Sequence, residues 1–396
     1  SSKTIEPCKS RSPSPENLTA RSVPYELFKA DHVAQACEML GLTFTSSSVV
    51  SIARDKVATR AALKAHGFTM PRYAAAAAVD QIPAAVTAIG LPCIVKPARG
   101  SGSRVCYPLY NDEQVDWYQA EARRVQAAAQ AYMQWIFANG FICEEVLKGP
   151  ILSVCVAAGH RNWHAVSVAL HAEQAVNPSV GFGSVLPISP EHHAASACAD
   201  YAVSVCEALD LSVGLFDAEM VFTESGPVLL EVNARPMGGE MIAAYELATG
   251  HDLFGTILDI YAGREFSTPT AGRGPKTVIR KLIAAEQGQV ASSLDHAALL
   301  KLIPAGVMLK NYRLYQGRHV HELEVLARLL MTAGDEWSGF AHLGEVAECI
   351  AAAAGVRLID GSLPDLPLMV VGDHSCLHLP EGLPSSSGRA LQSGPL

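Results

Sequence analysis

The sequence predicts an α+β fold of two or three lobes, and three features support this expectation. The chain has 396 residues, which is more than one ordinary hydrophobic core holds. Short apolar runs that suit strands alternate with amphipathic segments that suit helices. The strand-like runs 213–223 and 227–233 flank Glu224-Ser225-Gly226, which is a signal for a β-hairpin. We therefore expect hairpin-connected strands with helices packed beside them.

The composition narrows the classes of function. The formal net charge of −9 argues against a nucleic-acid partner, because binding a phosphate backbone requires a basic surface. No run of about 18 uncharged apolar residues is present, so we expect no membrane span. The 10 cysteines include no CxxC pair and no zinc-like cluster with histidine, which indicates reduced structural thiols. These features predict a cytoplasmic protein.

The first half of the chain is expected to open with helices and to continue as a small sheet. Residues 1–23 are polar and rich in Pro and Ser, which predicts a mobile segment. The expected helices span 25–40, 46–66, 80–90 and 112–138, and the expected strands span 70–75, 91–95, 105–107, 141–147 and 151–157. Gly41 and Gly67 follow the first two helices as stop signals.

The second half adds a strand at 164–172, a helix that opens at Ser189-Pro190, and the hairpin. Two more helices and a Pro/Gly-rich linker near 267–274 follow the hairpin. Residues 276–370 then form a further α+β segment, and the tail from Pro380 is expected to be disordered.

The hairpin carries the most informative polar residues. Alternation along a strand places Glu231, Asn233 and Arg235 on one face. A turn centred between the two runs sets Glu219 opposite Glu231 and Asp217 opposite Asn233. Facing carboxylates repel each other and therefore require a cation. Carboxylate and amide oxygens are ligands that suit Mg²⁺, with ATP phosphates and water completing its octahedron.

A solvated polar face at a sheet edge is the alternative interpretation of this hairpin. Met220, Phe222 and Leu230 are strongly apolar and indicate that one face of the hairpin belongs to a core. This pattern favours the metal site, although the register of the hairpin is an assumption.

A Gly/Ser-rich loop, Gly100-Ser101-Gly102-Ser103, follows the apolar run that ends at Lys96. Its glycines allow close approach of the backbone, and its N–H groups can bind an anion. Arg99 and Arg104 flank the loop with positive charge. The spacing is not that of a Walker A loop. A phosphate-binding loop and a simple hairpin turn both agree with this segment.

Taken in chain order, five segments resemble the motifs of the ATP-grasp superfamily. They are Ala53-Arg54-Asp55-Lys56, Ile94-Val95-Lys96-Pro97 with its Gly/Ser loop, Cys143-Glu144-Glu145-Val146-Leu147-Lys148-Gly149, Glu219, and Glu231-Val232-Asn233-Ala234-Arg235 with Gly238-Gly239. Within this superfamily the chain most resembles bacterial L-amino-acid (dipeptide) ligases and carnosine-synthase-type carboxylate–amine ligases. The resemblance covers about residues 42–262.

This resemblance implies an ATP-grasp fold of the α+β class, in which two α+β lobes clasp ATP. We expect an abbreviated N-terminal segment at 1–45 and the ATP-grasp domain at 46–265. A C-terminal α+β lobe is expected at 275–372 and a disordered tail at 380–396.

The resemblance also implies roles for individual residues. Those that would bind the nucleotide are Lys56, Lys96, Gly100, Ser101, Gly102, Ser103, Glu144, Glu145, Val146 and Leu147. In this set the lysines contact phosphates, the Gly/Ser loop closes over them, and residues 144–147 pair with adenine. The metal ligands would be Glu219, Glu231 and Asn233, holding Mg²⁺ or alternatively Mn²⁺. Lys96 and Arg235 would be catalytic, with Arg235 stabilising the acyl phosphate. Ile151 stands where the family carries a glutamate for the ribose.

The implied activity joins a small-molecule acid to an amine through an acyl phosphate, with release of ADP and phosphate. An amino acid or peptide is the expected substrate, no nucleic-acid or membrane partner is expected, and a homodimer is compatible with the resemblance. A biotin-carboxylase-like enzyme that phosphorylates bicarbonate and a degenerate, non-catalytic nucleotide-binding module are the alternatives. His171 or Glu173 could reach the substrate, although a single strand histidine is more often structural. Residues 177–184 are a candidate lid.

Overall fold

The computed structural model describes residues 29–100, 105–127, 131–159, 162–173, 181–268, 274–364 and 366. The expected mobile segment at 1–23 and the expected tail at 380–396 lie outside this part of the chain. Ser101, Gly102 and Ser103 of the Gly/Ser loop and residues 177–180 of the candidate lid also lie outside it.

Several of the helices begin where a Ser or Asp side chain accepts a hydrogen bond from a free N–H group. They are α1 (Lys29–Leu40), α2 (Ser47–Ala53), α3 (Lys56–Ala65), α4 (Ile82–Ile89), α5 (Asp112–Ala127), α6 (Ala131–Ala138), α7 (His193–Ala208), α8 (Met241–Thr249), α9 (Leu253–Tyr261), α10 (His296–Lys301) and α11 (Glu336–Ala354). The single helix expected over 46–66 is wrong, because Asp55 has an extended backbone and divides that segment into α2 and α3. The Asp55 carboxylate accepts hydrogen bonds from the N–H groups of Val57 and Ala58 and thereby caps α3.

The strands form a four-stranded sheet, an eight-stranded sheet and a small two-stranded sheet. They are β1 (Tyr73–Ala76), β2 (Cys93–Pro97), β3 (Tyr107–Leu109), β4 (Phe141–Glu145), β5 (Ile151–Gly159), β6 (Asn162–Ala172), β7 (Gly183–Leu186), β8 (Gly214–Thr223), β9 (Gly226–Asn233), β10 (Lys276–Ile283), β11 (Gly288–Gln289), β12 (Val307–Lys310), β13 (His319–Val320) and β14 (Val325–Ala333). The four-stranded sheet has the order β1-β4-β2-β3, and the eight-stranded sheet has the order β12-β14-β10-β7-β6-β5-β8-β9. All the named pairs in these sheets are antiparallel, which agrees with the predicted α+β class.

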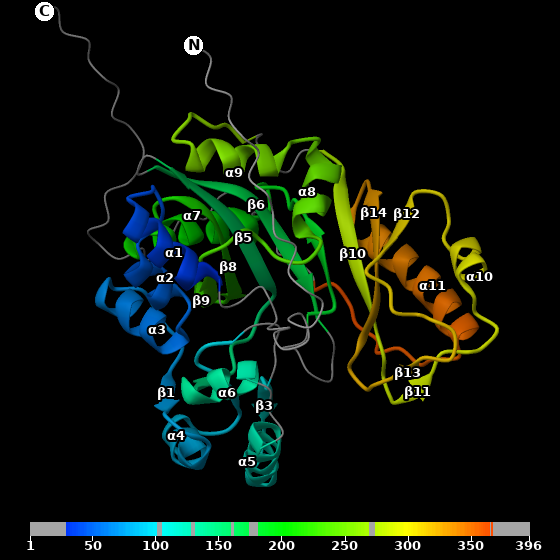
Figure 1. Ribbon diagram of the computed structural model, residues 1–396, viewed down its shortest axis with the longest axis horizontal. Helices are drawn as coiled ribbons and strands as arrows, with labels where there is room; N and C mark the ends of the chain where they lie inside the picture. Colours follow the sequence, from blue (N-terminus) through cyan, green and yellow to red (C-terminus); the bar gives the residue numbers. More distant parts are fainter. Residues whose placement is uncertain are drawn as a thin grey trace, which may run out of the picture.

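Helices cover both faces of the eight-stranded sheet (Figure 1). One face packs against α7 and α11, and this core is filled by residues such as Leu152, Leu170 and Leu343. The other face packs against α8 and α9 through Leu215, Tyr245 and neighbouring apolar residues. At one end of this second face the strands carry polar side chains, including Glu219 and His171. The candidate site lies at this end.

The small sheet forms a separate lobe with α4 and α5, drawn at the bottom of Figure 1. Its core contains Ile82, Val95 and Phe141, all of them buried. The apolar run before Lys96 is therefore the buried strand β2, as the sequence predicts. This arrangement places the end of β2 and Gly100, the first residue of the Gly/Ser loop, at the junction of the two lobes.

Of the strands that follow residue 274, β11 and β13 form the small two-stranded sheet, whereas the other three join the large sheet. Thr277 to Arg280 of β10 pair with Gly183 to Leu186 of β7, so β10, β14 and β12 extend the eight-stranded sheet. Side chains of β10, β14 and β12 consequently share one continuous face with side chains of β8 and β9 at the opposite edge of the sheet. Within the described ranges, no helix is both long and apolar enough to cross a membrane.

Candidate active site

The β8–β9 hairpin has the register that the sequence predicts. Glu219 is paired with Glu231, and Asp217 is paired with Asn233, with a register shift after Glu219. Burial, together with the neighbouring Glu231 and Asp217 carboxylates, raises the pKa of Glu219 to about 8. The ionised form of Glu219 is therefore disfavoured unless a cation compensates it.

Lys56 joins this cluster from the first residue of α3. Its Nζ lies 2.9 Å from Oε2 of Glu231. Burial opposes the ionisation of Glu231, but Lys56 outweighs it and lowers the pKa of Glu231 to about 2. The Nδ2 of Asn233 adds a hydrogen bond of 3.2 Å to Oε1 of Glu231. The structure thus brings the predicted phosphate-binding lysine and the predicted metal ligands into contact.

The three predicted metal ligands can take part in a Mg²⁺ site only with help from other oxygens. Among the described residues, no three His, Cys, Asp or Glu side chains lie close enough together to hold an ion by themselves. Mg²⁺ at nucleotide sites commonly takes one or two carboxylates and completes its octahedron with phosphate oxygens and water. A half-buried pair of facing carboxylates with an adjacent amide oxygen fits that partial donor set.

Arg235 lies beside the same carboxylates. Its Nη1 is 3.5 Å from Oδ2 of Asp217 and donates a 2.8 Å hydrogen bond to the carbonyl oxygen of Pro236. The guanidinium packs against Gly238, where an added Cβ would lie 3.2 Å from Nη1. The guanidinium is partly exposed and faces the cluster, as a group that binds developing negative charge would require.

Lys96 and Glu144 form a buried ion pair that the sequence does not reveal. The carboxylate of Glu144 accepts hydrogen bonds from Nζ of Lys96 at 2.6 Å and from Nε of Arg60 at 2.7 Å. Burial opposes the ionisation of Glu144, but Lys96 and Arg60 keep its pKa below the ordinary value. Arg60 also donates to the carbonyl oxygen of Leu230 at 2.7 Å. This cluster connects β2 and β4 of the small lobe to α3 and β9 of the large sheet.

The segment predicted to pair with adenine follows β4 directly. The side chain of Glu145 is engaged outside the site, since its Oε2 accepts from Nε of Arg72 at 2.9 Å. Val146 and Leu147 are half-buried and lie outside any regular element. Their backbone groups are therefore not used by the sheet, as an adenine-binding segment requires.

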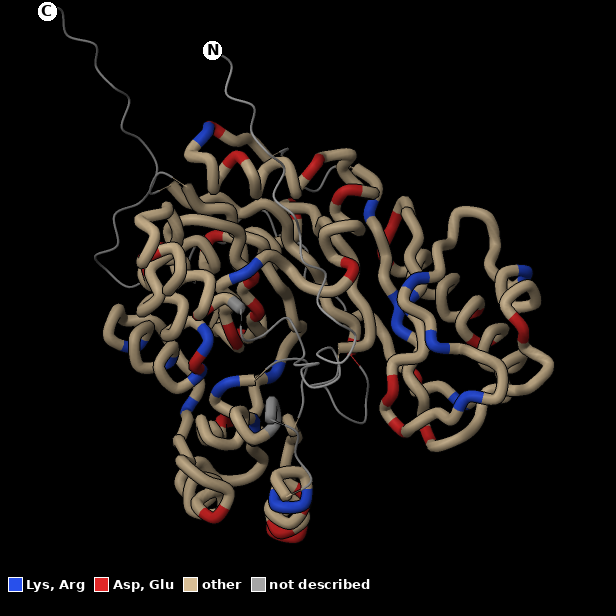
Figure 2. Tube along the Cα trace, viewed as in Figure 1, with Lys and Arg blue, Asp and Glu red and all other residues tan. Residues whose placement is uncertain are grey.

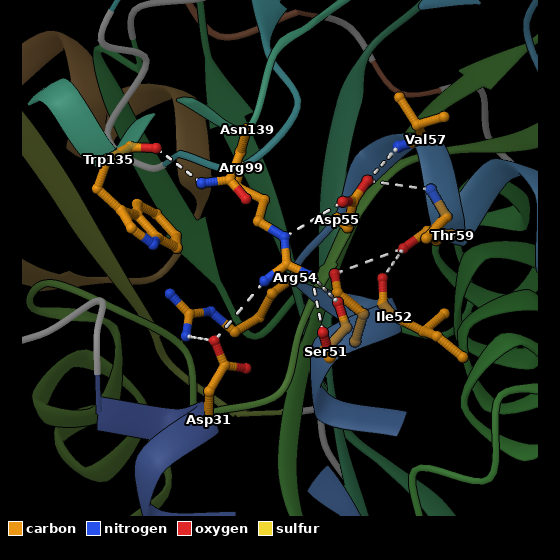
Figure 3. A network of polar contacts seen from close by, with 12 residues as sticks. Asp31, Ser51, Ile52, Arg54, Asp55, Val57, Thr59, Arg99, Trp135 and Asn139 are labelled. Carbon is orange, nitrogen blue, oxygen red and sulfur yellow. Dashed lines mark hydrogen bonds and ion pairs between the residues drawn. The ribbon is translucent and has the colours of Figure 1, made fainter. Parts of the chain in front are cut away.

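The base of the Gly/Ser loop is held by the polar network of Figure 3. Arg99 donates to Oδ2 of Asp55 at 3.2 Å and to Oγ of Ser51 at 2.7 Å. Arg54 forms an ion pair with Asp31 of α1, and its guanidinium lies 5.7 Å from the ring centre of Trp135 in α6. These contacts fix Gly100, which directly follows Arg99, next to α2 and α3.

A narrow pocket lies where these groups meet. Its lining residues are Ala53, Arg54, Lys56, Gly100, Glu231, Val232 and Asn233. A larger hollow lies elsewhere and contains none of the predicted site residues; it is lined by Thr43, Gly159, Asp210, Ser212, Val213, Ile260 and Gly263. We assign the narrow pocket to the site because its lining carries the lysine, the carboxylate and the loop glycine.

A chain of hydrogen bonds extends the site across three strands. Nε2 of His171 lies 2.8 Å from Oγ of Ser153, and Nδ1 of His171 lies 3.0 Å from Oγ of Ser184. Ser153 of β5 is also paired with Glu219 of β8. Sequence reasoning missed both serines. The available signal was one hydroxyl residue inside an apolar strand, as in Leu152-Ser153-Val154.

Lowering the pH is expected to destabilise the protein through His171. Burial and then the charge of Lys281 lower the pKa of His171 to about 4. Between about pH 6.5 and 4 the unfolded chain binds a proton that the folded protein does not bind, so this stabilisation is lost as the pH falls through that interval. The stability of the wild type relative to His171→Asn, measured by urea unfolding, should fall by about 1–2 kcal/mol between pH 7 and pH 4.5.

The exposed His321 provides the control for this measurement. His321→Asn makes the same exchange at an exposed position and shows what the exchange itself does to the free energy of unfolding. The same pH dependence in the wild type and in His171→Asn would show that His171 does not remain neutral in the folded protein.

Comparison with known proteins finds similarity over the part of the chain that carries this site. A family model described as an ATP-grasp domain matches residues 53–239. Alanine–anticapsin ligase of Bacillus subtilis is 27% identical over 266 residues, which are 62% of this chain and 54% of that enzyme. D-alanine–D-alanine ligase B of Xanthomonas campestris is 32% identical over 124 residues, which are 30% of this chain and 35% of that enzyme. The chain therefore spans about half or less of the length of these curated relatives.

Solved structures show the same fold. The L-amino acid ligase of Bacillus licheniformis superposes with a TM-score of 0.67 at 15% identity, covering 83% of this chain and 79% of that chain. Biotin carboxylase of Campylobacter jejuni superposes with a TM-score of 0.59 at 15% identity, covering 85% of this chain and 74% of that chain. These superpositions confirm the fold class that the sequence predicts.

Proposed function

We propose that the chain is an ATP-dependent carboxylate–amine ligase, because a family model described as an ATP-grasp domain matches residues 53–239. It would form an amide or peptide bond through an acyl phosphate and release ADP and phosphate. The observation that carries this proposal is the half-buried Glu219–Glu231 pair, which lies beside Lys56 and Arg235 at the junction of two lobes. The relatives named as amino-acid ligases favour this activity over bicarbonate phosphorylation and over a non-catalytic module.

Nucleotide binding would use both sides of the junction. Lys56 and Lys96 would approach the phosphates, each from an ion pair that already orients its ammonium group. Gly100 and the following Ser101 to Ser103 would close over them, and residues 144–147 would pair with adenine. Glu219, Glu231 and Asn233 would hold Mg²⁺, or alternatively Mn²⁺, which would neutralise charge on the phosphates.

The reaction would proceed in two transfers at this site. A carboxylate oxygen of the acid attacks the γ-phosphorus of ATP, the bond to the β–γ bridging oxygen breaks, and ADP leaves. The amine then attacks the acyl carbon and loses a proton, and phosphate leaves with one oxygen of the original carboxylate. Arg235 is placed to stabilise the negative oxygens of both steps.

We further propose that the substrates are a small-molecule acid and a small-molecule amine, and that the protein acts in the cytoplasm. The absence of a membrane-spanning helix among the described residues is compatible with that location. A homodimer stays a prediction.

The expected products distinguish this mechanism from adenylation. A panel of amino acids, tested alone and in pairs with Mg·ATP, should release ADP and phosphate and no AMP, because the γ-phosphoryl group is the one transferred. Hydroxylamine in place of the amine should trap a hydroxamate of the acid. ¹⁸O in the carboxylate of the acid should appear in the released phosphate.

Two outcomes would contradict the proposal. Formation of AMP and pyrophosphate would show adenylation, and ¹⁸O that stays wholly in the product would exclude an acyl phosphate. Bicarbonate belongs in the same panel, because ADP release with bicarbonate alone would favour a biotin-carboxylase-like reaction.

A further inference from the structure

Three basic residues lie side by side on β10, β14 and β12. Lys281 is paired with Arg328, and Arg328 is paired with Lys310. Directly paired residues of antiparallel strands point to the same face, and like charges in such positions repel. Figure 2 shows Lys and Arg positions gathered on this part of the trace. This basic row lies near one edge of the eight-stranded sheet, and the acidic Glu219–Glu231 pair lies near the opposite edge.

Other cations of β10 have acidic partners, whereas this row has none among the described residues. Lys276 lies 3.8 Å from Glu336, and Arg280 lies 3.7 Å from Asp360. In the part of the chain that the structure describes, neither Lys281 nor Arg328 forms a salt bridge with a carboxylate, and both are half-buried. Half-buried cations that face each other without a counter-ion are typical of an anion-binding site.

Lys281 is held in position by the backbone. Its Nζ donates a 2.7 Å hydrogen bond to the carbonyl oxygen of Gly181, where an added Cβ would lie only 3.2 Å from Nζ. Burial and then Arg328 lower the pKa of Lys281 to about 8, while Glu219 acts in the opposite direction. The ammonium group is therefore oriented and lies within electrostatic reach of the carboxylate cluster.

The basic row and the carboxylate cluster lie on the same face of the sheet. Ile279 is paired with Ser184, and Lys281, two residues farther along β10, points to the same face as Ile279. Hydrogen bonds link Ser184 to His171 and His171 to Ser153, and Ser153 is the residue of β5 that is paired with Glu219. Between the negative and the positive groups the floor thus consists of neutral hydrogen-bonding side chains.

We propose that Lys281 and Arg328 bind the non-reacting carboxylate of an amino-acid substrate. This inference rests on the proposed ligase function, in which the reacting carbon must lie near Glu219, Glu231 and Arg235. A second anionic group on either substrate must then lie away from that centre, and the basic row is the place on this face that receives it. The carboxylate belongs either to the amine donor, as its α-carboxylate, or to a dicarboxylic acid substrate.

Substrates with and without that carboxylate test the site. For an amino-acid pair that releases ADP, the amine donor is compared with its carboxamide, and a dicarboxylic acid substrate with its distal amide. Lys281→Met should raise KM for the carboxylate form of one of the two substrates by about tenfold or more and leave the KM of its amide unchanged. Lys281→Arg keeps the charge and should retain most of the preference for the carboxylate. The substrate whose preference is lost identifies which carboxylate is bound.

Lys301→Met is the matched control, because Lys301 is an exposed lysine of α10 in the same part of the chain. It should change neither KM, and thermal unfolding of each variant establishes that its fold is intact.

Calorimetric binding of the same amino acids and amides separates the site from the ligase activity. If the wild type binds a free amino acid more tightly than its amide but shows no turnover, the ligase proposal is contradicted and the proposed carboxylate site still stands. Equal preference in the wild type and in Lys281→Met, or no preference in the wild type, would overturn the carboxylate site.

Discussion

Glu231→Gln is expected to lower ATP-dependent turnover by about 100-fold or more while the protein stays folded. The substitution preserves the size of the side chain but removes a charge from the cluster that faces Glu219. It weakens the donor set for Mg²⁺ and also leaves Lys56, 2.9 Å away, without its anionic partner. Lys56 would then be less well oriented toward the phosphates.

Glu224→Gln is the matched control, since Glu224 is exposed in the turn of the same hairpin. Both variants should have the far-UV circular dichroism of the wild type, and only Glu231→Gln should lose ADP release at saturating Mg²⁺. If Glu231→Gln retained a tenth of the wild-type rate under these conditions, Glu231 would not be a metal ligand.

Arg60→Met is expected to lower the free energy of unfolding by about 3–5 kcal/mol. The Arg60 side chain is 0% exposed, and Glu144, which accepts its Nε, is 2% exposed. Removing the guanidinium leaves the buried carboxylate with Lys96 as its remaining cation and removes a donor from the carbonyl oxygen of Leu230. Because water cannot replace these bonds in the interior, most of the desolvation cost remains.

Arg72→Met provides the comparison on the protein surface. Arg72 pairs with Glu145, the neighbour of Glu144, but the side chain of Arg72 is 67% exposed. An exposed pair of this kind contributes about 0–1 kcal/mol. Urea unfolding of the two variants should therefore differ by at least about 2 kcal/mol. Equal losses would mean that the Arg60–Glu144 pair stabilises no more than a surface contact.

The hairpin could be predicted because its information is local. Alternation between Asp217 and Glu231 determines which side chains share a face, and Glu224-Ser225-Gly226 determines where the chain turns. A register error of one residue would have moved every one of these side chains to the opposite face. Glu219 does pair with Glu231, but a register shift after Glu219, which neither local signal encodes, contributes to this pairing.

The two lysines show where local information ends. The motifs identified Lys56 and Lys96 as phosphate-binding candidates, but not the carboxylates with which they pair. Lys56 meets Glu231 because α3 lies against β9, and Lys96 meets Glu144 because β2 pairs with β4. Asp55 had a local function that the sequence analysis overlooked, since it caps α3 and thereby places Lys56 at the start of that helix.

The sequence by itself determined the α+β class, the motif order and the face of the hairpin, because these depend on neighbours along the chain. Only the tertiary structure decided that Ser153, His171, Ser184 and Lys281 share a face with Glu219. Their strands belong to distant segments, and pairing β10 with β7 joins the basic row to the carboxylate cluster. Such pairing follows from how whole strands pack between α7, α8 and α11, and no local pattern encodes it.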